Sequence, residues 1–335
     1  MKRGRNVNTM VAKRVRRIAF GILLVVLTVF LCITVWRVSH KYFLKKFHRE
    51  ERVSKLYDEW NAHNYEEVYR ISEAILEKNF LQNAARTFHG YSSFLLAVSE
   101  NDNAEYQNLL DEAIINLRIA LQYAKDDVKP QIEYMLGRTY FYKDVVPVHS
   151  DFYKDKESES QHYYSDLAIK YLLASQEDGF EAKDTSEYLG LSYAALGETQ
   201  KSIEAFAQAL KYRESDTLLL SIAEQYCNAS QGKTAKQYLK RADNLTKDED
   251  IKLRCKFLLA QICMEEESFE EAEQVFLEIA ENQELPGSAR ADAHYGLGVI
   301  YEKQKDLVKA RYEWRYALNL NSNHKGSRLK MAEHN

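Results

Sequence analysis

The stretch YLGLSYAALGETQKSIEAFAQAL, from Tyr188 to Leu210, alternates small and large residues at helical spacing. A Leu-Gly pair precedes Tyr193, and after a second Gly the chain places Phe206 three residues before Ala209. Small residues let two antiparallel helices approach closely, and large residues fill the space beside them. The stretch therefore predicts a helical hairpin whose two helices pack against each other.

The same pattern occurs three more times along the chain. Its other copies are Ile222-Ala223, Tyr226, Ala235, Leu239 and Ala242; Leu259-Ala260, Cys263, Ala272, Phe276 and Ile279; and Leu297-Gly298, Tyr301, Ala310, Trp314 and Ala317. The anchor residues at 193, 226, 263 and 301 are 33, 37 and 38 residues apart. A fixed period near 34 indicates an array of helical repeats, in which each hairpin buries its apolar stripes against its neighbours.

This pattern resembles the tetratricopeptide repeat (TPR) family, which has Leu-Gly and Tyr on a first helix and Ala, Phe and Ala on a second. The resemblance covers roughly Tyr65 to Leu320. Ser202 departs from it where an Ala usually begins the second helix, and Cys263 replaces the Tyr. The terminal Pro is mostly missing, although Pro286 ends one unit. The resemblance implies an all-α solenoid of helical hairpins that forms a right-handed superhelix.

The front half of the array is less regular. YMLGRTY (134–140) reads as a first helix, but its partner DLAIKYLLA appears only at 166–174. We predict an array of six to seven units over residues 56–322, with insertions near 98–108 and 143–164. Residues 323–335 are predicted to form a carboxy-terminal cap or tail.

The amino-terminal region predicts a membrane anchor. Residues 1–17 hold seven Lys or Arg and no acid, and residues 18–36 form a run of 19 residues without charge. As a helix this run is about 28 Å long, close to the thickness of a bilayer's hydrocarbon core. A cleaved signal peptide would have a shorter apolar run followed by a small-x-small site, which is absent here. We therefore predict that residues 18–36 span the bilayer as an uncleaved helix, followed by a helical stalk at 37–55.

The charges that flank this run bear on its orientation. The dense basic segment 1–17 favours a cytoplasmic amino-terminal tail, with the repeats on the non-cytoplasmic side, the periplasm in a bacterium. The far flank is also basic, so the opposite orientation stays open. The chain carries a formal net charge of −4 overall. Its body is acidic, which argues against nucleic acid as a partner.

No sequence motif for catalysis is present. The chain lacks a phosphate-binding loop, a G-x-G-x-x-G motif, a G-x-S-x-G motif and an H-E-x-x-H motif, and its nine His do not show metal-ligand spacing. We therefore expect a protein that is not an enzyme and that uses no cofactor and no metal.

The resemblance implies that the first helices line a concave groove that accepts a peptide or helix of another protein. With the register taken from the Leu-Gly pairs, the predicted partner-binding residues are Tyr134, Arg138, Phe141, Leu191, Leu220, Phe257, Gln261 and Tyr295. Aromatic and Arg side chains are enriched at binding hot spots. The alternative that we keep open is that these side chains only complete the packing between repeats.

The predicted function is that of a membrane-anchored scaffold that binds partner proteins. One alternative is a structural subunit of a large membrane or envelope machine, such as a periplasmic collar of a flagellar motor. Another is a cytosol-facing receptor similar to mitochondrial import receptors. That family holds a carboxylate tail with a clamp of Lys and Asn, which the equivalent positions do not match: Asp184, Glu187, Thr217, Leu220, Arg254 and Phe257.

Overall fold

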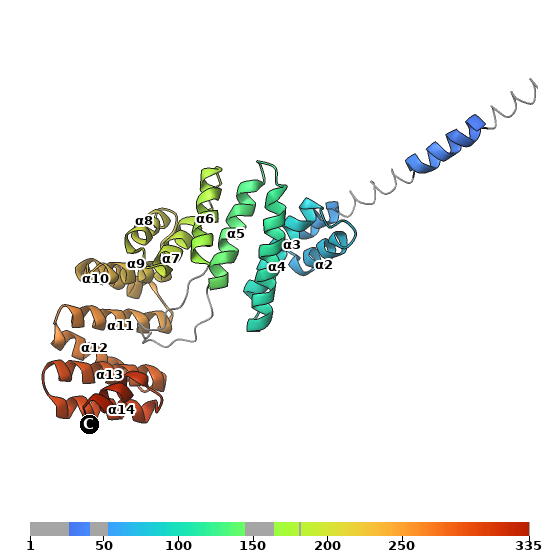
Figure 1. Cartoon of the computed structure of the whole chain (residues 1–335). Helices are drawn as coiled ribbons and strands as arrows, with labels where there is room; N and C mark the ends of the chain where they lie inside the picture. The colour runs from blue at the N-terminus through green and yellow to red at the C-terminus, as the bar shows by residue number, and fades with distance from the viewer. Residues whose placement is uncertain (1–26, 41–52, 145–163, 181, 335) are drawn as a thin grey trace, which may run out of the picture. The chain divides into compact units, whose positions relative to one another are not determined.

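The computed structural model describes residues 27–40, 53–144, 164–180 and 182–334. These residues form helices and turns, and none of them lies in a β-strand (Figure 1). The chain divides into two compact units, Met1–Ser92 and Ser93–Asn335. The helical content and the hairpin order agree with the predicted solenoid.

The first unit has a small apolar core of its own. It contains a helix at residues 53–61, helix α2 (Tyr65–Leu76) and the beginning of α3 (Asn83–Ser99). Leu56, Val68, Ile75, Ala85 and Phe88 are buried together. These residues come from all three helices, so the beginning of the predicted array, which starts at residue 56, also buries an apolar stripe.

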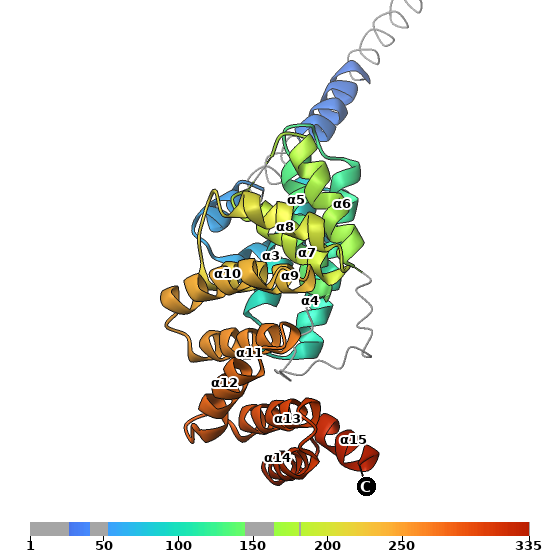
Figure 2. The same cartoon turned by 90° about the vertical axis from the view of Figure 1, so that its left-hand side faces the viewer.

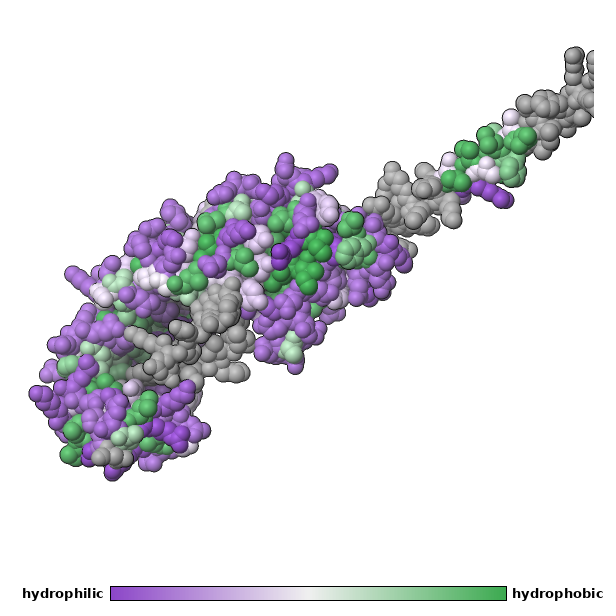
Figure 3. Space-filling view, viewed as in Figure 1, coloured by the Kyte–Doolittle hydropathy of each residue, from purple (hydrophilic) through white to green (hydrophobic). Residues whose placement is uncertain are grey.

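A separate helix at residues 27–40 carries apolar side chains on its surface (Figure 3). Its large apolar residues are between 46% and 66% exposed. Residues 18–26 of the predicted membrane span lie outside the described part of the chain. Within the described residues, no helix reaches the length and apolar character needed to cross a membrane.

The second unit is a stack of helical hairpins (Figures 1 and 2). After α3 its helices are α4 (Asn103–Gln122), α5 (Lys129–Asp144), α6 (Ser165–Glu177), α7 (Thr185–Ala195), α8 (Thr199–Ala209), α9 (Asp216–Asn228), α10 (Gly232–Leu245), α11 (Glu249–Glu265), α12 (Phe269–Glu281), α13 (Gly287–Lys303), α14 (Leu307–Leu320) and α15 (Lys325–Glu333). From α4 onward each helix packs on the next, and α5 with α6 begins a series of hairpins that ends with α13 and α14.

Close contact between a glycine and a large side chain holds these hairpins together. A Cβ atom added at Gly190 would overlap the ring of Phe206, and one added at Gly298 would overlap the indole of Trp314. Both large side chains are 0% exposed. The pairing of small with large residues that the sequence predicted is therefore the packing contact between the two helices of a repeat.

The turn inside each regular hairpin has one residue in the left-handed region. That residue is Gly197 in the first regular repeat, and Ser230, Glu267 and Lys305 in the next three, with φ between 56° and 72°. The amide of the following residue donates to the carbonyl of the anchor residue, as in Glu198 N to Tyr193 O at 2.9 Å. This pattern is that of a Schellman motif, which satisfies carbonyls at the end of the first helix.

The structure bears on the two predicted insertions and on the carboxy-terminal segment. The segment near 98–108 is not an inserted loop, because α3 extends to Ser99 and α4 begins at Asn103. Its extra residues add turns to two longer helices. Most of the predicted insertion at 143–164 lies outside the described residues. The carboxy-terminal segment contains α15, where a Cβ added at Gly326 would lie 2.8 Å from the ring of Tyr295, so α15 covers the end of the last repeat.

Candidate partner-binding face

The first helices of successive hairpins form one face of the second unit. Helix α5 contacts α7, α7 contacts α9, and α9 contacts α11. We call the outward surface of α5, α7, α9, α11 and α13 the first-helix face. The eight predicted binding residues all belong to these five helices.

The amino-terminal end of this face, at α5 and α7, holds a cluster of aromatic rings around Arg138. The Arg138 guanidinium carbon lies 5.0 Å from the ring centre of Phe94, 5.3 Å from that of Tyr188 and 5.5 Å from that of Tyr134. Such distances permit cation–π attraction. We call this group, together with Phe141 and Tyr142, the Arg138 cluster; its members come from α3, α5 and α7.

The rings of the Arg138 cluster also contact one another. Phe141 lies 5.1 Å from Tyr188 between ring centres, and Phe94 lies edge-on to Tyr142 at 5.4 Å. The hydroxyls of Tyr142 and Tyr188 are 3.4 Å apart. Because each ring packs on a neighbouring ring, the aromatic side chains around the guanidinium restrict its movement.

The charge of Arg138 has no carboxylate partner in the part of the chain that the structure describes. Its Nη2 donates a long hydrogen bond of 3.3 Å to the Tyr188 hydroxyl. Its Nε is buried and makes no hydrogen bond to the residues that the structure describes. The side chain as a whole is partly exposed. A half-buried guanidinium with unused donors is well suited to receive an oxygen atom from a bound molecule.

Among the described acids, Asp184 acts on Arg138 without a salt bridge: burial disfavours the guanidinium charge, but electrostatic interaction with Tyr188, Tyr134 and Asp184 raises the pKa of Arg138. The Tyr134 hydroxyl donates to Asp184 Oδ1 at 2.6 Å, across the boundary between α5 and the start of α7. Burial, together with this hydrogen bond, raises the pKa of Tyr134, and burial raises the pKa of Tyr188. Both phenols therefore stay neutral at physiological pH, and they do not neutralise Arg138.

The remaining predicted residues are placed differently along the face. Leu191 and Phe257 are half-buried against the cores of their repeats, and Tyr295 packs on His324 with ring centres 5.1 Å apart. Gln261 is exposed and donates to Glu265 at 3.0 Å. Leu220 is only 1% exposed, because it packs among Leu219, Cys227 and Cys255. Leu220 is thus a core residue, contrary to the placement that the helical register suggested. Tyr134 is also buried, at 8% exposure, in a core with Leu172 and Leu189.

The residues that complete the Arg138 cluster were not among those predicted. Phe94 and Tyr142 were missed, and Tyr188 was read only as the residue before the Leu-Gly pair. A Phe or Tyr on the first helix of each neighbouring hairpin is a signal that could have found them, since adjacent first helices lie side by side.

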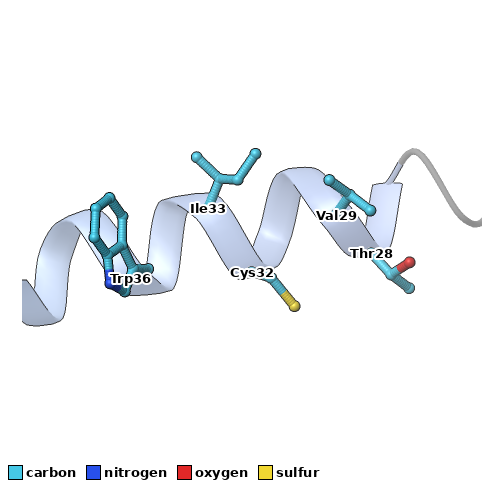
Figure 4. Close-up of a pocket in the computed structure, with 5 residues that line it drawn as sticks. All are labelled: Thr28, Val29, Cys32, Ile33 and Trp36. Atoms are coloured by element: carbon cyan, nitrogen blue, oxygen red, sulfur yellow. The ribbon is translucent and has the colours of Figure 1, made fainter.

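Two other features of the described residues were considered as sites. Thr28, Val29, Cys32, Ile33 and Trp36 line a shallow hollow, but all five lie on one helix and no other described residue lines it (Figure 4). Glu302, Glu333 and His334 bring three ligand atoms within 4.8 Å of one another. Lys330 forms ion pairs of 3.1 and 3.2 Å with the two carboxylates, so an ammonium group already supplies the positive charge there.

Comparison with known proteins bears on the repeat and on the fold. Residues 291–324 match the model of the tetratricopeptide repeat. No curated protein matches the chain.

Solved structures with the same architecture include the C-terminal part of a TPR repeat-containing protein from Cytophaga hutchinsonii. It is 12% identical, with a TM-score of 0.52 over 82% of this chain and 97% of that one. The apo form of the quorum sensor NprR from B. thuringiensis is 14% identical, with a TM-score of 0.53 over 82% of this chain and 77% of that one. At these identities the likeness concerns the fold. Residues 291–324 therefore match one tetratricopeptide repeat, and the rest of the array shares the fold of these repeat proteins.

Proposed function

We propose that this protein is a membrane-anchored scaffold that holds a segment of a partner protein on its first-helix face. The observation that carries the proposal is the Arg138 cluster: a partly exposed guanidinium among three aromatic rings, whose buried Nε makes no hydrogen bond to any described residue. Arg and Tyr are the side chains that most often dominate binding energy at protein interfaces.

Electrostatics favours this interpretation over a purely structural role. Moving a charged group out of water costs several kcal/mol unless an opposite charge or hydrogen-bond acceptors compensate it. The aromatic rings compensate part of this cost, at about 0.5–2 kcal/mol for a cation–π contact. A carboxylate or a backbone carbonyl of a bound segment would supply the acceptor that Nε lacks.

The anchor is proposed on separate grounds. The charge-free run at 18–36 is long enough for a bilayer, and the part of it within helix 27–40 leaves large apolar residues exposed. We propose that this segment holds the protein in the bilayer with its amino-terminus in the cytoplasm and the repeats on the other side. If the full-length protein leaves its native membranes in alkaline carbonate, or if a carboxy-terminal reporter signals from the cytoplasm, this part of the proposal is wrong.

The binding proposal is tested by purifying the tagged full-length chain from its native membranes in mild detergent and quantifying the proteins that accompany it. Arg138→Met keeps the aliphatic stem and removes the charge. We expect it to lower the yield of a specific partner by about tenfold or more, as for a hot spot of roughly 1.4 kcal/mol. The matched control is Arg254→Met on α11, because Arg254 already pairs with Glu224 at 2.8 Å.

Retention of every partner by Arg138→Met would contradict the binding role of the cluster. Equal losses in Arg138→Met and Arg254→Met would place the contact along the whole face instead of at its front.

A further inference from the structure

The outer surface of α14, the second helix of the last hairpin, differs from the same surface of the hairpins before it. Val308, Tyr312 and Tyr316 are 82%, 64% and 38% exposed. The core residues Ala310, Trp314 and Ala317 fix the register of α14, since they align with the buried residues of α8, α10 and α12. Each exposed position of α14 can therefore be compared with its equivalents.

The three equivalent helices carry polar residues at these positions, and all of them are exposed. They are Gln200, Glu204 and Gln208 in α8; Lys233, Gln237 and Arg241 in α10; and Glu270, Gln274 and Glu278 in α12. Helix α4 also exposes one large apolar residue, Ile115, but the exposed residue one turn earlier is the acid Asp111. The fold thus does not require apolar side chains here, and their exposure on α14 needs another reason.

The three side chains form one continuous ridge. A spacing of four residues places them on one side of the helix, one turn apart. The rings of Tyr312 and Tyr316 are 6.3 Å apart, and Tyr316 also packs on His294 at 4.4 Å. The ridge is therefore ordered, and its members are residue types that lose little entropy when a partner covers them.

Positive charge predominates in the carboxy-terminal segment that carries this ridge. Residues 303–335 contain eight Lys or Arg and three Asp or Glu, a net of +5, in a chain whose overall charge is −4. Lys309 and Arg315 are exposed on α14 itself. The acid Glu313 is half-buried and bound to His294 at 2.7 Å, so it does not offset these cations at the surface. Asp306 forms an ion pair with Lys309 at 3.6 Å, which offsets part of the charge of Lys309.

We infer that the α14 ridge, defined by Val308, Tyr312 and Tyr316, is a docking surface for an amphipathic helix of a partner protein whose apolar stripe is flanked by Asp or Glu. The apolar ridge fits an apolar stripe, and Lys309 and Arg315 complement acidic flanks. A second copy of α14 fits poorly, since it would bring like charges together. A bilayer also fits poorly, because one Val and two Tyr offer little apolar area for insertion.

This surface is distinct from the first-helix face. It lies on a second helix, and the Trp314 side of the same helix faces the core. Binding at the α14 ridge consequently does not depend on the Arg138 cluster, and the two can fail separately.

The experiment is photo-cross-linking in the full-length chain, expressed in its native cells. A benzoyl-phenylalanine replaces Tyr312, and the matched controls carry it at Gln237 or Gln274, the equivalent positions of α10 and α12. The cross-linked segment is identified by mass spectrometry. We expect adducts from position 312 at about tenfold or more above both controls, the size of effect typical for a hot-spot contact. The adduct should lie in a segment of another protein with helical apolar spacing and net negative charge.

Second substitutions test the chemistry. With the cross-linker at 312, Val308→Gln plus Tyr316→Gln should remove the adduct, and Arg315→Glu should reduce it, whereas Arg315→Lys should keep it. Unchanged thermal unfolding would show that these variants remain folded. The inference is overturned by adducts no stronger than at 274, by a lipid adduct, by cross-linking to a second copy of the chain, or by a partner segment without acidic residues.

Discussion

An arginine lies between neighbouring first helices in two regions of the molecule. In one region it pairs with a carboxylate, and in the other it forms no salt bridge with a described residue. Between α9 and α11, Arg254 donates to Glu224 at 2.8 Å. Between α5 and α7, Arg138 meets a tyrosine hydroxyl at 3.3 Å and aromatic rings, and within the described residues it forms no salt bridge. Helix stacking is common to both regions, so the difference lies in the chemistry of the surface.

This difference distinguishes the contacts that stabilise the array from the side-chain groups that are available to bind a partner. Exposed ion pairs such as Arg254–Glu224 contribute about 0–1 kcal/mol, and they leave no donor group in need of a partner. Arg138 keeps an unused donor in a partly buried place. We therefore expect the two regions to respond alike when their cores are changed and differently when their arginines are changed.

The largest effects should come from the cores and should be similar in both regions. Leu172→Ala in α6 and Phe206→Ala in α8 each remove a side chain that is 0% exposed and packs on a glycine of the first helix. The lost burial and the remaining cavity should cost about 2–5 kcal/mol of unfolding free energy in each case. Denaturant unfolding measures this cost. A loss below about 1 kcal/mol for Leu172→Ala alone would mean that the front hairpin is not built like the others.

Substitutions in the turns of two regular hairpins should change the stability of the chain in opposite directions. Gly197→Ala places a Cβ at φ 72° and should destabilise the chain by about 1 kcal/mol. Lys305→Gly relieves the same strain at φ 66° and should raise stability by up to about 1 kcal/mol. Thermal melts of the two variants give the comparison. Destabilisation by Lys305→Gly would show that the Lys305 side chain contributes more than the turn geometry.

Removing the two arginine charges should change stability little. Arg138→Met exchanges cation–π attraction for relief from desolvation, so we expect a net change within about 1 kcal/mol. Arg254→Met should lose at most about 1 kcal/mol, since it breaks an exposed pair. If Arg138→Met instead unfolds the protein, Arg138 is a structural residue, and the distinction between the two regions disappears.

Alkaline pH should lower the free energy of unfolding because Tyr106 of α4 loses its proton more readily in the unfolded chain. Burial raises the pKa of Tyr106 to about 12, from an ordinary value of about 10. The unfolded chain therefore loses this proton first. The stabilising contribution is fully present below pH 10 and declines as the pH rises towards 12. Tyr106→Phe, which also removes the hydrogen bond to the Tyr142 carbonyl, should show a shallower decline of unfolding free energy above pH 10. An unchanged slope would contradict this assignment.

Much of the fold follows from the spacing of residues along the chain. The period near 34 predicted the hairpins, and the Leu-Gly pairs predicted the close contacts that Gly190 and Gly298 make. The sequence did not reveal the left-handed turn residue of each hairpin. Glycine, which favours this conformation, is present only at Gly197 among the four turns, and the others have Ser230, Glu267 and Lys305. In those turns, the Schellman hydrogen bonds fix a conformation that the local sequence does not favour.

The candidate site was predicted less completely. Helical register alone placed Leu220 beside Tyr134 and Phe257, but burial also depends on the next repeat, which covers Leu220 with Cys255. The surround of Arg138 combines three helices that are far apart in sequence. No local pattern could show that Arg138 forms no salt bridge with a described carboxylate.

Hydrogen exchange provides the most direct test of the central claim, that the first-helix face around Arg138 holds the partner. The full-length chain is compared alone and with the partner that co-purifies from native membranes. We expect slower amide exchange in α5 and α7, with a smaller change in α9 and α11, and loss of that protection in Arg138→Met. Unchanged exchange in α5 and α7 while the partner is bound would contradict the account.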